Sequence, residues 1–418
     1  MEDRDPGAGS PGAPSTRDMA PSPAGGGTQA RPAGQAPGKK RKRKRKRDRK
    51  VFARNGFGAP DGLAAVEAPQ AQEIRREIAD RLPTGAANGA FAALDLGTNN
   101  CRLLVAYPTR PRQFRVVDAF SRIVRLGEGL STSGRLSDAA MDRAVDALKV
   151  CAAKLRSRPI RGARLIATEA CRSAANGGDF LRRVRDEAGL ELEIIDRRTE
   201  AHLAVSGCES LVERGTEGVV LFDIGGGSSE IALIDLTRGR RSNLAAHVVD
   251  WTSLPIGVVS LAERFGGRTV TRATFDAMID HVDGLLDGFT GRRKLDHVAR
   301  SRHFHLLGTS GTVTTLAGVH LDLPRYERRR VDGLWMDADS VERMTDKLLG
   351  WDFEQRVRNP CIGADRADLV LAGCAILQAI RRAWPSERLR VADRGLREGI
   401  LSQLMSEAGA WPARGSRR

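Results

Sequence analysis

The sequence predicts an α/β protein whose ordered part consists of two similar domains facing each other across a cleft. Three observations predict this fold class. From Ala90 onward, apolar segments of strand length alternate with glycine turns and amphipathic helices. One strand–turn–strand pattern occurs twice, in residues 91–107 and again in residues 219–235. Residues 1–88, in contrast, are rich in Gly, Pro, Ala and Ser and lack apolar periodicity, which predicts a disordered tail.

The internal repeat is the most informative of these observations. The two copies read FAALDLGTNNCRLLVAY and VVLFDIGGGSSEIALID, and aligning Asp95 with Asp223 also aligns Gly97 with Gly225 and the apolar runs on both sides. Each copy is typical of a β-hairpin whose tight turn presents a carboxylate and bare backbone amides. We therefore expect a tail at 1–88, one domain at 89–212 and a second at 213–410, whose last helix can pack back on the first domain.

The remaining elements follow from local patterns along the chain. Ser137 is expected to cap a helix that has Asp138 in its first turn. A strand at 303–307 is expected to end at the sequence GTSGT, which opens a helix from Val313. Further strands are expected at 122–126, 165–168, 192–195 and 390–392, and further helices at 179–188 and 396–407.

Composition excludes several classes of protein. The apolar runs are far shorter than the roughly 20 residues of a membrane-spanning helix, and the N-terminus lacks the charged start and apolar core of a secretory signal. The 6 cysteines contain no CxxC pair, which argues against a structural zinc site and a thioredoxin-like motif. The sequence therefore predicts a cytoplasmic protein without a membrane partner and with reduced thiols.

The formal net charge of +16 is concentrated in one block. Residues 39–50 hold eleven basic side chains and one acidic side chain, so the rest of the chain is only mildly basic. Two interpretations of this block stay open: a solvated linker, or sequence-independent contact with RNA, DNA or polyphosphate. A protein that binds nucleic acid through its tail is the function class that this block alone supports.

Three loops carry residues suited to phosphate chemistry. The turn DIGGGSSE, residues 223–230, places three glycines between carboxylates and hydroxyls. Glycines let backbone N–H groups approach phosphate oxygens, and carboxylates hold divalent cations. The turn after Asp95 and the GTSGT loop have related compositions. Together, the three loops indicate a phosphorylated ligand.

In this order, the loops resemble those of the acetate kinase, sugar kinase, actin and heat-shock-chaperone superfamily, in which two ribonuclease-H-like domains clamp such a ligand. A narrower resemblance rests on the segments RLGEGLSTSGRLS, ATEACRSA, FDIGGGSSE, LPIGVVSLAERF and LLGTSGTVTTLAG, which are similar to successive motifs of the exopolyphosphatase and guanosine pentaphosphate phosphatase family. The resemblance covers nearly all of residues 90–410. It implies two actin-like ATPase domains with an interdomain cleft, and the hydrolysis of phosphoanhydride bonds.

The resemblance also implies a role for each matching residue. The general base of the family is a glutamate in a segment that matches residues 193–207, which assigns this role to Glu200. A carboxylate in a cleft can orient the attacking water and accept its proton. Asp95, Asp223 and Glu230 are expected to hold a divalent cation, with Mg²⁺ as the expected ion. Phosphate is expected to bind at Gly97, Thr98, Asn99, Arg172, Gly225, Gly226, Gly227, Ser228, Gly308, Ser310 and Gly311.

Inorganic polyphosphate is the expected substrate, because the glycine loops, carboxylates and arginines of the motifs are suited to bind phosphate. A guanine base would be expected to stack on an aromatic residue, and none stands beside a motif. Guanosine pentaphosphate, cleaved by the same chemistry, is the alternative. A sugar kinase or an actin-like ATPase would share the hairpins but would leave the glutamate segment unexplained. Since relatives are often homodimers, the resemblance implies a homodimer here as well.

Overall fold

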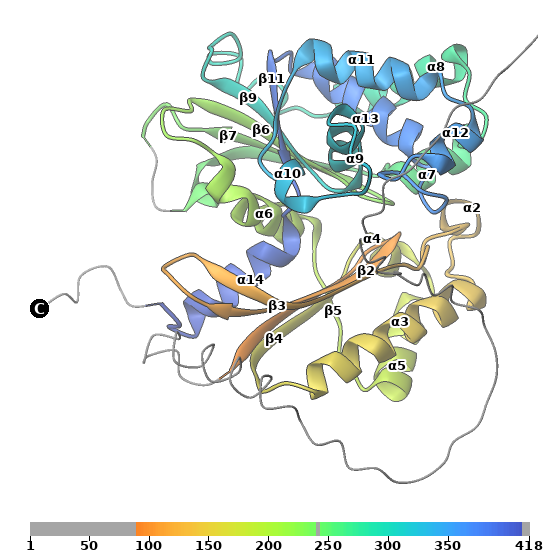
Figure 1. Ribbon diagram of the computed structural model, residues 1–418, viewed down its shortest axis with the longest axis vertical. Coiled ribbons are helices and arrows are strands. Elements are labelled where there is room, and N and C mark those ends of the chain that lie inside the picture. The colour runs from red at the N-terminus through yellow and green to blue at the C-terminus, as the bar shows by residue number, and fades with distance from the viewer. Residues whose placement is uncertain (1–88, 240–242, 412–418) are drawn as a thin grey trace, which may run out of the picture. The chain divides into compact units, whose positions relative to one another are not determined.

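The computed structural model describes residues 89–239 and 243–411, so the predicted tail at 1–88 with its basic block lies outside the described residues. The described residues form two mixed β-sheets covered by helices (Figure 1). Across these two stretches, no helix combines the length and the apolar character that crossing a bilayer requires.

The first sheet has the strand order β3-β2-β1-β4-β5. Strands β1 and β2 pair antiparallel, as do β2 and β3, whereas β4 joins β1 in parallel and β5 joins β4 in parallel. Apolar side chains of α3 and α5 fill one face. The elements are β1 Ala90–Leu96, β2 Asn100–Pro108, β3 Phe114–Ile123, α2 Leu130–Ser133, α3 Asp138–Arg156, β4 Ile160–Ala167, α4 Glu169–Ser173, α5 Gly177–Ala188, β5 Glu193–Ile194 and α6 Arg197–Cys208.

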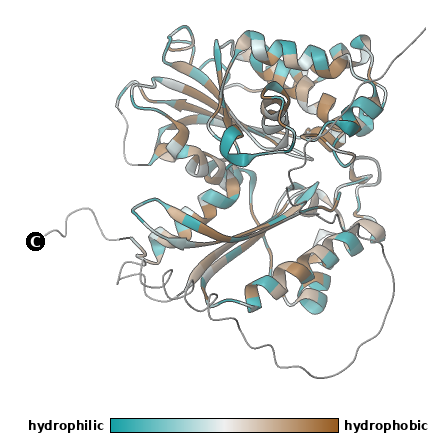
Figure 2. Cartoon of the chain, viewed as in Figure 1, coloured by the Kyte–Doolittle hydropathy of each residue, from teal (hydrophilic) through white to brown (hydrophobic). Residues whose placement is uncertain are grey.

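The second sheet has the order β10-β11-β9-β6-β7-β8. Its largest apolar core lies against α7, α8, α9, α11 and α13. The short helix α10 is coloured hydrophilic in Figure 2. The elements are β6 Gly218–Ile224, β7 Ser229–Asp235, β8 Val248–Leu254, α7 Val258–Phe265, α8 Arg272–Asp287, β9 Phe304–Thr309, α9 Gly311–His320, α10 Arg328–Val331, β10 Trp335–Asp337, α11 Ala338–Leu349, α12 Phe353–Arg358, α13 Val370–Ala383, β11 Arg388–Ala392 and α14 Leu396–Glu407, with 3₁₀ turns at Glu209–Leu211 and Leu244–His247.

The predicted repeat is confirmed and extends to the whole sheet. The orders β3-β2-β1-β4-β5 and β8-β7-β6-β9-β11 are equivalent, because each has an antiparallel hairpin at its centre followed by two parallel strands. Helix α6 packs on the second sheet, whereas α14 packs on the first sheet and against α6. Both helices therefore lie between the two sheets (Figure 1).

The strand expected at 122–126 is placed differently in the structure. Strand β3 ends at Ile123, and the backbone N–H groups of Val124 and Arg125 both donate to the carbonyl oxygen of Asn99. The chain therefore folds onto the first hairpin turn instead of continuing the ladder, and Arg125 adopts a positive φ of 46°. The Arg125 guanidinium then reaches the other half of the molecule, where it binds both carboxylate oxygens of Asp368 at 2.9 and 3.0 Å.

Side-chain caps set the start of two helices that matter for the site. As predicted, the Ser137 hydroxyl caps α3 by accepting from the Ala140 N–H. Asp196 caps α6 in the same way, since its carboxylate accepts from the Thr199 N–H at 2.7 Å. This cap fixes Glu200 in the first turn of α6.

Candidate active site

The two hairpin turns line one cleft with a volume of about 720 Å³. The cleft collects residues from both sheets, from the first turn of α6 and from the loop between β9 and α9. Most of the residues singled out from the sequence line it: Asp95, Gly97, Thr98, Asn99, Glu200, Asp223, Gly225, Gly226, Gly227, Ser228, Glu230, Ser310 and Gly311.

The two turns have the same closure and touch each other. The Gly97 N–H donates to the Asn100 carbonyl and the Gly225 N–H donates to the Ser228 carbonyl, both at 2.9 Å. A Cβ atom added to Gly226 would lie 2.9 Å from the Cβ of Thr98, closer than real Cβ atoms approach one another. A side chain at Gly226 would therefore force the turns apart.

Both turns present backbone N–H groups to the cleft. Within the described residues, no hydrogen-bond acceptor is found for the N–H groups of Thr98, Asn99, Gly226, Gly227 and Ser228. Successive amides of this kind form a concave anion-binding surface. In addition, the side-chain oxygens of Asn99 and Asn100 are buried and find no hydrogen-bond partner among residues 89–239 and 243–411. The turns thus offer donors for phosphate oxygens and acceptors for water.

Of the residues expected to bind phosphate around the loop between β9 and α9, two line the cleft and one does not. Gly308 does not line the cleft: a Cβ atom there would lie 2.6 Å from the Phe222 ring and 2.7 Å from Val313, so this glycine serves packing. Ser310 and Gly311 do line the cleft. Ser310 has a φ of 77°, and its hydroxyl donates to the Ile224 carbonyl at 2.6 Å, which ties the loop to the end of β6.

The four carboxylates singled out from the sequence, Asp95, Asp223, Glu230 and Glu200, all line the cleft, and their pKa values reflect this crowding. Burial, together with the nearby Asp95, raises the pKa of Asp223 to about 6. Burial, together with Asp223, raises the pKa of Glu230 to about 7, although Ser228 and the Ser253 hydroxyl at 2.8 Å stabilise its anion. Burial also raises the pKa of Asp95, but here Arg102 and Arg397 oppose the shift.

Glu200 is the fourth of these carboxylates. Burial raises its pKa well above the ordinary value, Glu230 and Asp95 raise it further, and Arg172 opposes the shift. In the described part of the chain, the only hydrogen bond to its side chain comes from Arg172 Nη2, at 3.1 Å from Oε2. A buried carboxylate with a raised pKa and few donors is well suited to accept a proton.

Another acid that lines the cleft, Glu169, has the opposite environment. Burial favours its neutral form, yet hydrogen bonds from Arg197, Ser173 and Arg172 outweigh burial and hold its pKa below the ordinary value. Because it accepts five hydrogen bonds in total, it stays ionised. Glu169 is therefore a poor proton acceptor, which favours Glu200 as the base.

Arg172 lies behind the cleft and does not line it. Its guanidinium donates to Glu169, Glu200 and the Ile195 carbonyl. In this arrangement, Arg172 does not point its guanidinium into the cleft as a phosphate ligand would.

Several cationic and aromatic side chains of the cleft were missed from the sequence. Arg102 stands opposite Asp95 in the β1–β2 ladder, so the hairpin register alone could have revealed it. The other residues come from parts of the chain outside the recognised motifs, and no pattern in a single sequence indicates that they line the cleft. The missed lining residues are Arg102, Phe120, Tyr326, Arg328, Arg366, Arg394 and Arg397.

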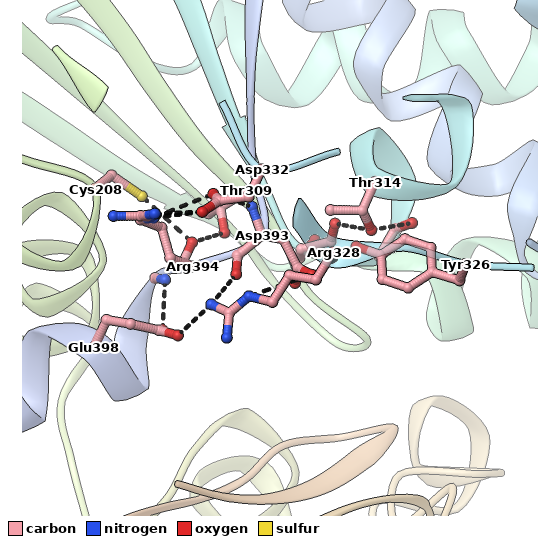
Figure 3. Close-up of polar contacts among 12 residues, drawn as sticks. Cys208, Thr309, Thr314, Tyr326, Arg328, Asp332, Asp393, Arg394 and Glu398 are labelled. Carbon is pink, nitrogen blue, oxygen red and sulfur yellow. Dashed lines mark hydrogen bonds and ion pairs between the residues drawn. The ribbon is translucent and has the colours of Figure 1, made fainter. Parts of the chain in front are cut away.

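Some of these residues form a polar network on the second half of the molecule (Figure 3). The Tyr326 hydroxyl donates to Asp393 at 2.6 Å, and Arg328 donates to Glu398 at 2.8 Å. Figure 3 shows the Arg394 guanidinium directed at Asp332, to which it is hydrogen-bonded. The cleft thus contains an aromatic ring beside a half-buried carboxylate, which corrects the expectation that no aromatic residue accompanies the motifs.

Asp95, Asp223 and Glu230, the expected ligands of a divalent cation, all line the cleft. Among residues 89–239 and 243–411, no group of three or more His, Cys, Asp or Glu side chains is arranged to hold a metal ion. Mg²⁺ at phosphate sites usually takes one or two carboxylates plus water and phosphate oxygens, so a preformed cage is not required. Asp223 and Glu230 face each other across β6 and β7, and the charge of Asp223 helps to raise the pKa of Glu230. These residues fit a divalent cation.

Comparison with known proteins places the chain. The model of the Ppx/GppA phosphatase family matches residues 105–408. The chain belongs to this family. The Ppx/GppA match confirms the family resemblance, and the family is described as one of phosphatases.

Individual relatives agree with the family match. Over 318 residues, the chain is 27% identical to a guanosine-5'-triphosphate,3'-diphosphate pyrophosphatase of Photobacterium profundum. The matched region covers 76% of this chain but only 59% of that relative. A solved PPX-GPPA enzyme of Aquifex aeolicus is 28% identical, with a TM-score of 0.60, and covers 75% of this chain and 99% of that one. An exopolyphosphatase of Cytophaga hutchinsonii, 22% identical with a TM-score of 0.68, covers 77% and 99% and supports the fold.

These matches confirm the predicted fold class of two ribonuclease-H-like, actin-like ATPase domains. The domain limits 89–212 and 213–410, the homodimer, the cytoplasmic location and the contact of residues 39–50 with polyanions all stay predictions.

Proposed function

We propose that this chain removes the terminal phosphate from inorganic polyphosphate, with Glu200 as the general base. The observation that carries the proposal is the environment of Glu200. It is a buried carboxylate with a raised pKa, and it lines the same cleft as two glycine turns with free backbone amides. Phosphoanhydride hydrolysis needs positioned phosphate oxygens and an oriented water, and this cleft offers groups for both.

The reaction follows from these groups. The amides of Thr98 and Asn99 on one turn, and of Gly226, Gly227 and Ser228 on the other, donate to oxygens of the terminal phosphate. Glu200 accepts a proton from a water molecule whose oxygen forms a bond to the terminal phosphorus. The bridging phosphorus–oxygen bond breaks, and the shortened chain leaves with the electron pair on its oxygen.

Asp223 and Glu230, with Asp95 nearby, would hold Mg²⁺. When bound, this ion neutralises charge on the phosphate oxygens. The cleft arginines Arg102, Arg328 and Arg397 add positive charge along the path of the remaining chain. Arginine is suited to this task because its planar fork matches phosphate oxygens.

Guanosine pentaphosphate is a second candidate substrate, favoured by a specific observation. Tyr326 lies in the cleft and its hydroxyl donates to the Asp393 carboxylate, and a ring beside a carboxylate is suited to a base that carries an exocyclic amino group. The curated relative carries the name of such an enzyme. Specificity constants for both substrates under one metal and salt condition decide between them: a clear preference for guanosine pentaphosphate would replace the lead assignment.

The role of Glu200 is tested by Glu200→Gln, which keeps shape and removes the basic oxygen. Turnover should fall by about 10²–10⁴-fold, the usual worth of a general base. Glu187→Gln is the matched control, because Glu187 makes surface ion pairs on α5 far from the cleft residues. Turnover of Glu200→Gln within about threefold of the control contradicts the assignment.

A further inference from the structure

Helix α4 lies beside the cleft and carries two charged side chains to which the proposed reaction gives no role. Glu169 is its first residue and lines the cleft, Arg172 follows one turn later, and Arg172 joins Glu169 to Glu200. The side chains of these residues are largely buried, with exposed fractions of 11%, 17% and 13% for Glu169, Arg172 and Glu200.

The Arg172 guanidinium is fixed by nearly all of its donors. Its Nε and Nη2 both bind one oxygen of Glu169, at 3.1 and 2.6 Å, and its Nη1 binds the Ile195 carbonyl at 2.5 Å. The second N–H of Nη2 is directed to Glu200 Oε2 at 3.1 Å. Four of five N–H groups are thereby occupied, which leaves little capacity for a phosphate.

Glu169 is itself held in place. Arg197, in the first turn of α6, donates to its two oxygens at 3.2 and 2.8 Å, and the Ser173 hydroxyl donates to Oε1. The plane of the Arg172 guanidinium is therefore set by Glu169, whose position is in turn fixed from two helices. With Glu169 and Glu200 ionised and both arginines charged, the four side chains are electrically balanced.

We propose that Glu169 is a positioning residue for the reaction: through Arg172, it holds one oxygen of Glu200 so that the other oxygen faces the water in the cleft. The inference rests on the proposed function, in which Glu200 is the base. Arg172 is then a second positioning residue and not a phosphate ligand. By occupying Arg172 with its own charge, Glu169 also limits the pairing of Arg172 with Glu200 to a single hydrogen bond.

The test is the kinetics of Glu169→Gln with tripolyphosphate as substrate. The amide removes one strong acceptor and presents N–H groups to the two arginines, so Arg172 turns toward Glu200 and displaces its oxygens. We expect kcat to fall by about 10- to 100-fold, the scale of a small misplacement of a reacting group, while KM stays within about twofold. A rise in KM at unchanged kcat overturns the proposal, because it is the signature of a lost phosphate ligand.

The double variant Glu169→Gln/Glu200→Gln separates this inference from the proposed function. With the base already removed, the change at Glu169 should lower the residual turnover by less than about twofold, since coupled groups are not additive. A further tenfold loss overturns the inference. If Glu200→Gln alone retains nearly full turnover, the proposed base is wrong, which is a different result from either of these.

Arg172→Lys provides an independent measurement, because lysine keeps the charge but cannot bridge two carboxylates in one plane. It should reproduce the loss of kcat at unchanged KM, whereas Glu187→Gln, which disrupts a surface pair with Arg183, should change neither constant. Thermal melting checks folding, and loss of the fold in both Glu169→Gln and Arg172→Lys would assign the cluster to stability and overturn the proposal.

Discussion

The two central hairpins have the same strand pairing, but the charged residues that face each other differ: the first pairs an acid with a base, and the second pairs two acids. In the first, Asp95 of β1 stands opposite Arg102 of β2. In the second, Asp223 of β6 stands at the equivalent position and faces Glu230 of β7. The two turns contact each other, so this difference lies within one cleft.

This comparison explains how a duplicated unit supports two tasks. In the first hairpin, Arg102 compensates the carboxylate and opposes the rise in the pKa of Asp95. In the second, two acids face each other. Burial and Asp95 raise the pKa of Asp223 to about 6, although Arg102 also opposes this shift, and burial and Asp223 raise the pKa of Glu230 to about 7. Excess negative charge of this kind favours a cation. We therefore assign phosphate binding mainly to the first hairpin and the cation mainly to the second.

The largest difference between the hairpins is expected for one glycine substitution in each turn, Gly226→Ala and Gly97→Ala. Gly226→Ala places a Cβ atom 2.9 Å from Thr98 and should separate the turns, which lowers turnover by about a hundredfold and costs about 1–3 kcal/mol of unfolding free energy. Gly97→Ala meets its nearest atom at 3.6 Å, so its effects should be much smaller. Turnover and thermal melting of both variants measure these effects. Equal losses of turnover and stability in the two variants would show that the contact between the turns is unimportant.

The second prediction concerns stability against pH in metal-free protein. Because the folded state raises the pKa of Glu230 from 4.5 to about 7, its stabilising contribution is fully present below pH 4.5 and is lost as the pH rises through 7. The free energy of unfolding should therefore fall between pH 5 and pH 8, by on the order of 1–3 kcal/mol. Excess Mg²⁺ should restore it.

Glu230→Gln should remove most of this decline, since the amide does not titrate. Glu187→Gln is the control, because surface arginine and lysine pairs lower the pKa of Glu187 and the slope above pH 5 should persist. A decline that is unchanged in Glu230→Gln would assign the pH dependence to other groups.

The smallest effect is expected for Ser253→Ala. The Ser253 hydroxyl donates to Glu230 Oε1 at 2.8 Å and stabilises its anion. Its removal should raise the pKa of Glu230 further, with a loss of about 1 kcal/mol at pH 8, the usual worth of one hydrogen bond. Melting curves at pH 5 and pH 8 test this, and an equal loss at both pH values would contradict the link to Glu230.

The sequence predicted the hairpins and their carboxylates because both features are local. The apolar alternation and the glycine turns around Asp95 and Asp223 sufficed, and the limits of the helix at 396–407 agree with α14. The strand expected at 122–126 failed for a tertiary reason: the carbonyl of Asn99 attracts the N–H groups of Val124 and Arg125. No local pattern encodes that contact.

The same limit applies to the site. Tyr326 follows α9, Arg328 begins α10 and Arg397 lies in α14, and all three line the cleft. A single sequence does not reveal that these elements meet there. Glu169 stood within a recognised motif, but its role depends on Arg197, 28 residues further along. Chemistry that resides in one turn was predictable, whereas chemistry assembled from several elements was not.

The division of labour between the hairpins is tested most directly by the Mg²⁺ concentration that gives half-maximal phosphate release from tripolyphosphate. Asp223→Asn removes a carboxylate from the pair of facing acids and should raise this concentration by about tenfold or more, the scale seen when metal-site residues are lost. Asp95→Asn, beside Arg102, should raise it less. An equal or larger increase for Asp95→Asn, or full activity of the wild-type chain after exhaustive chelation, would contradict the account.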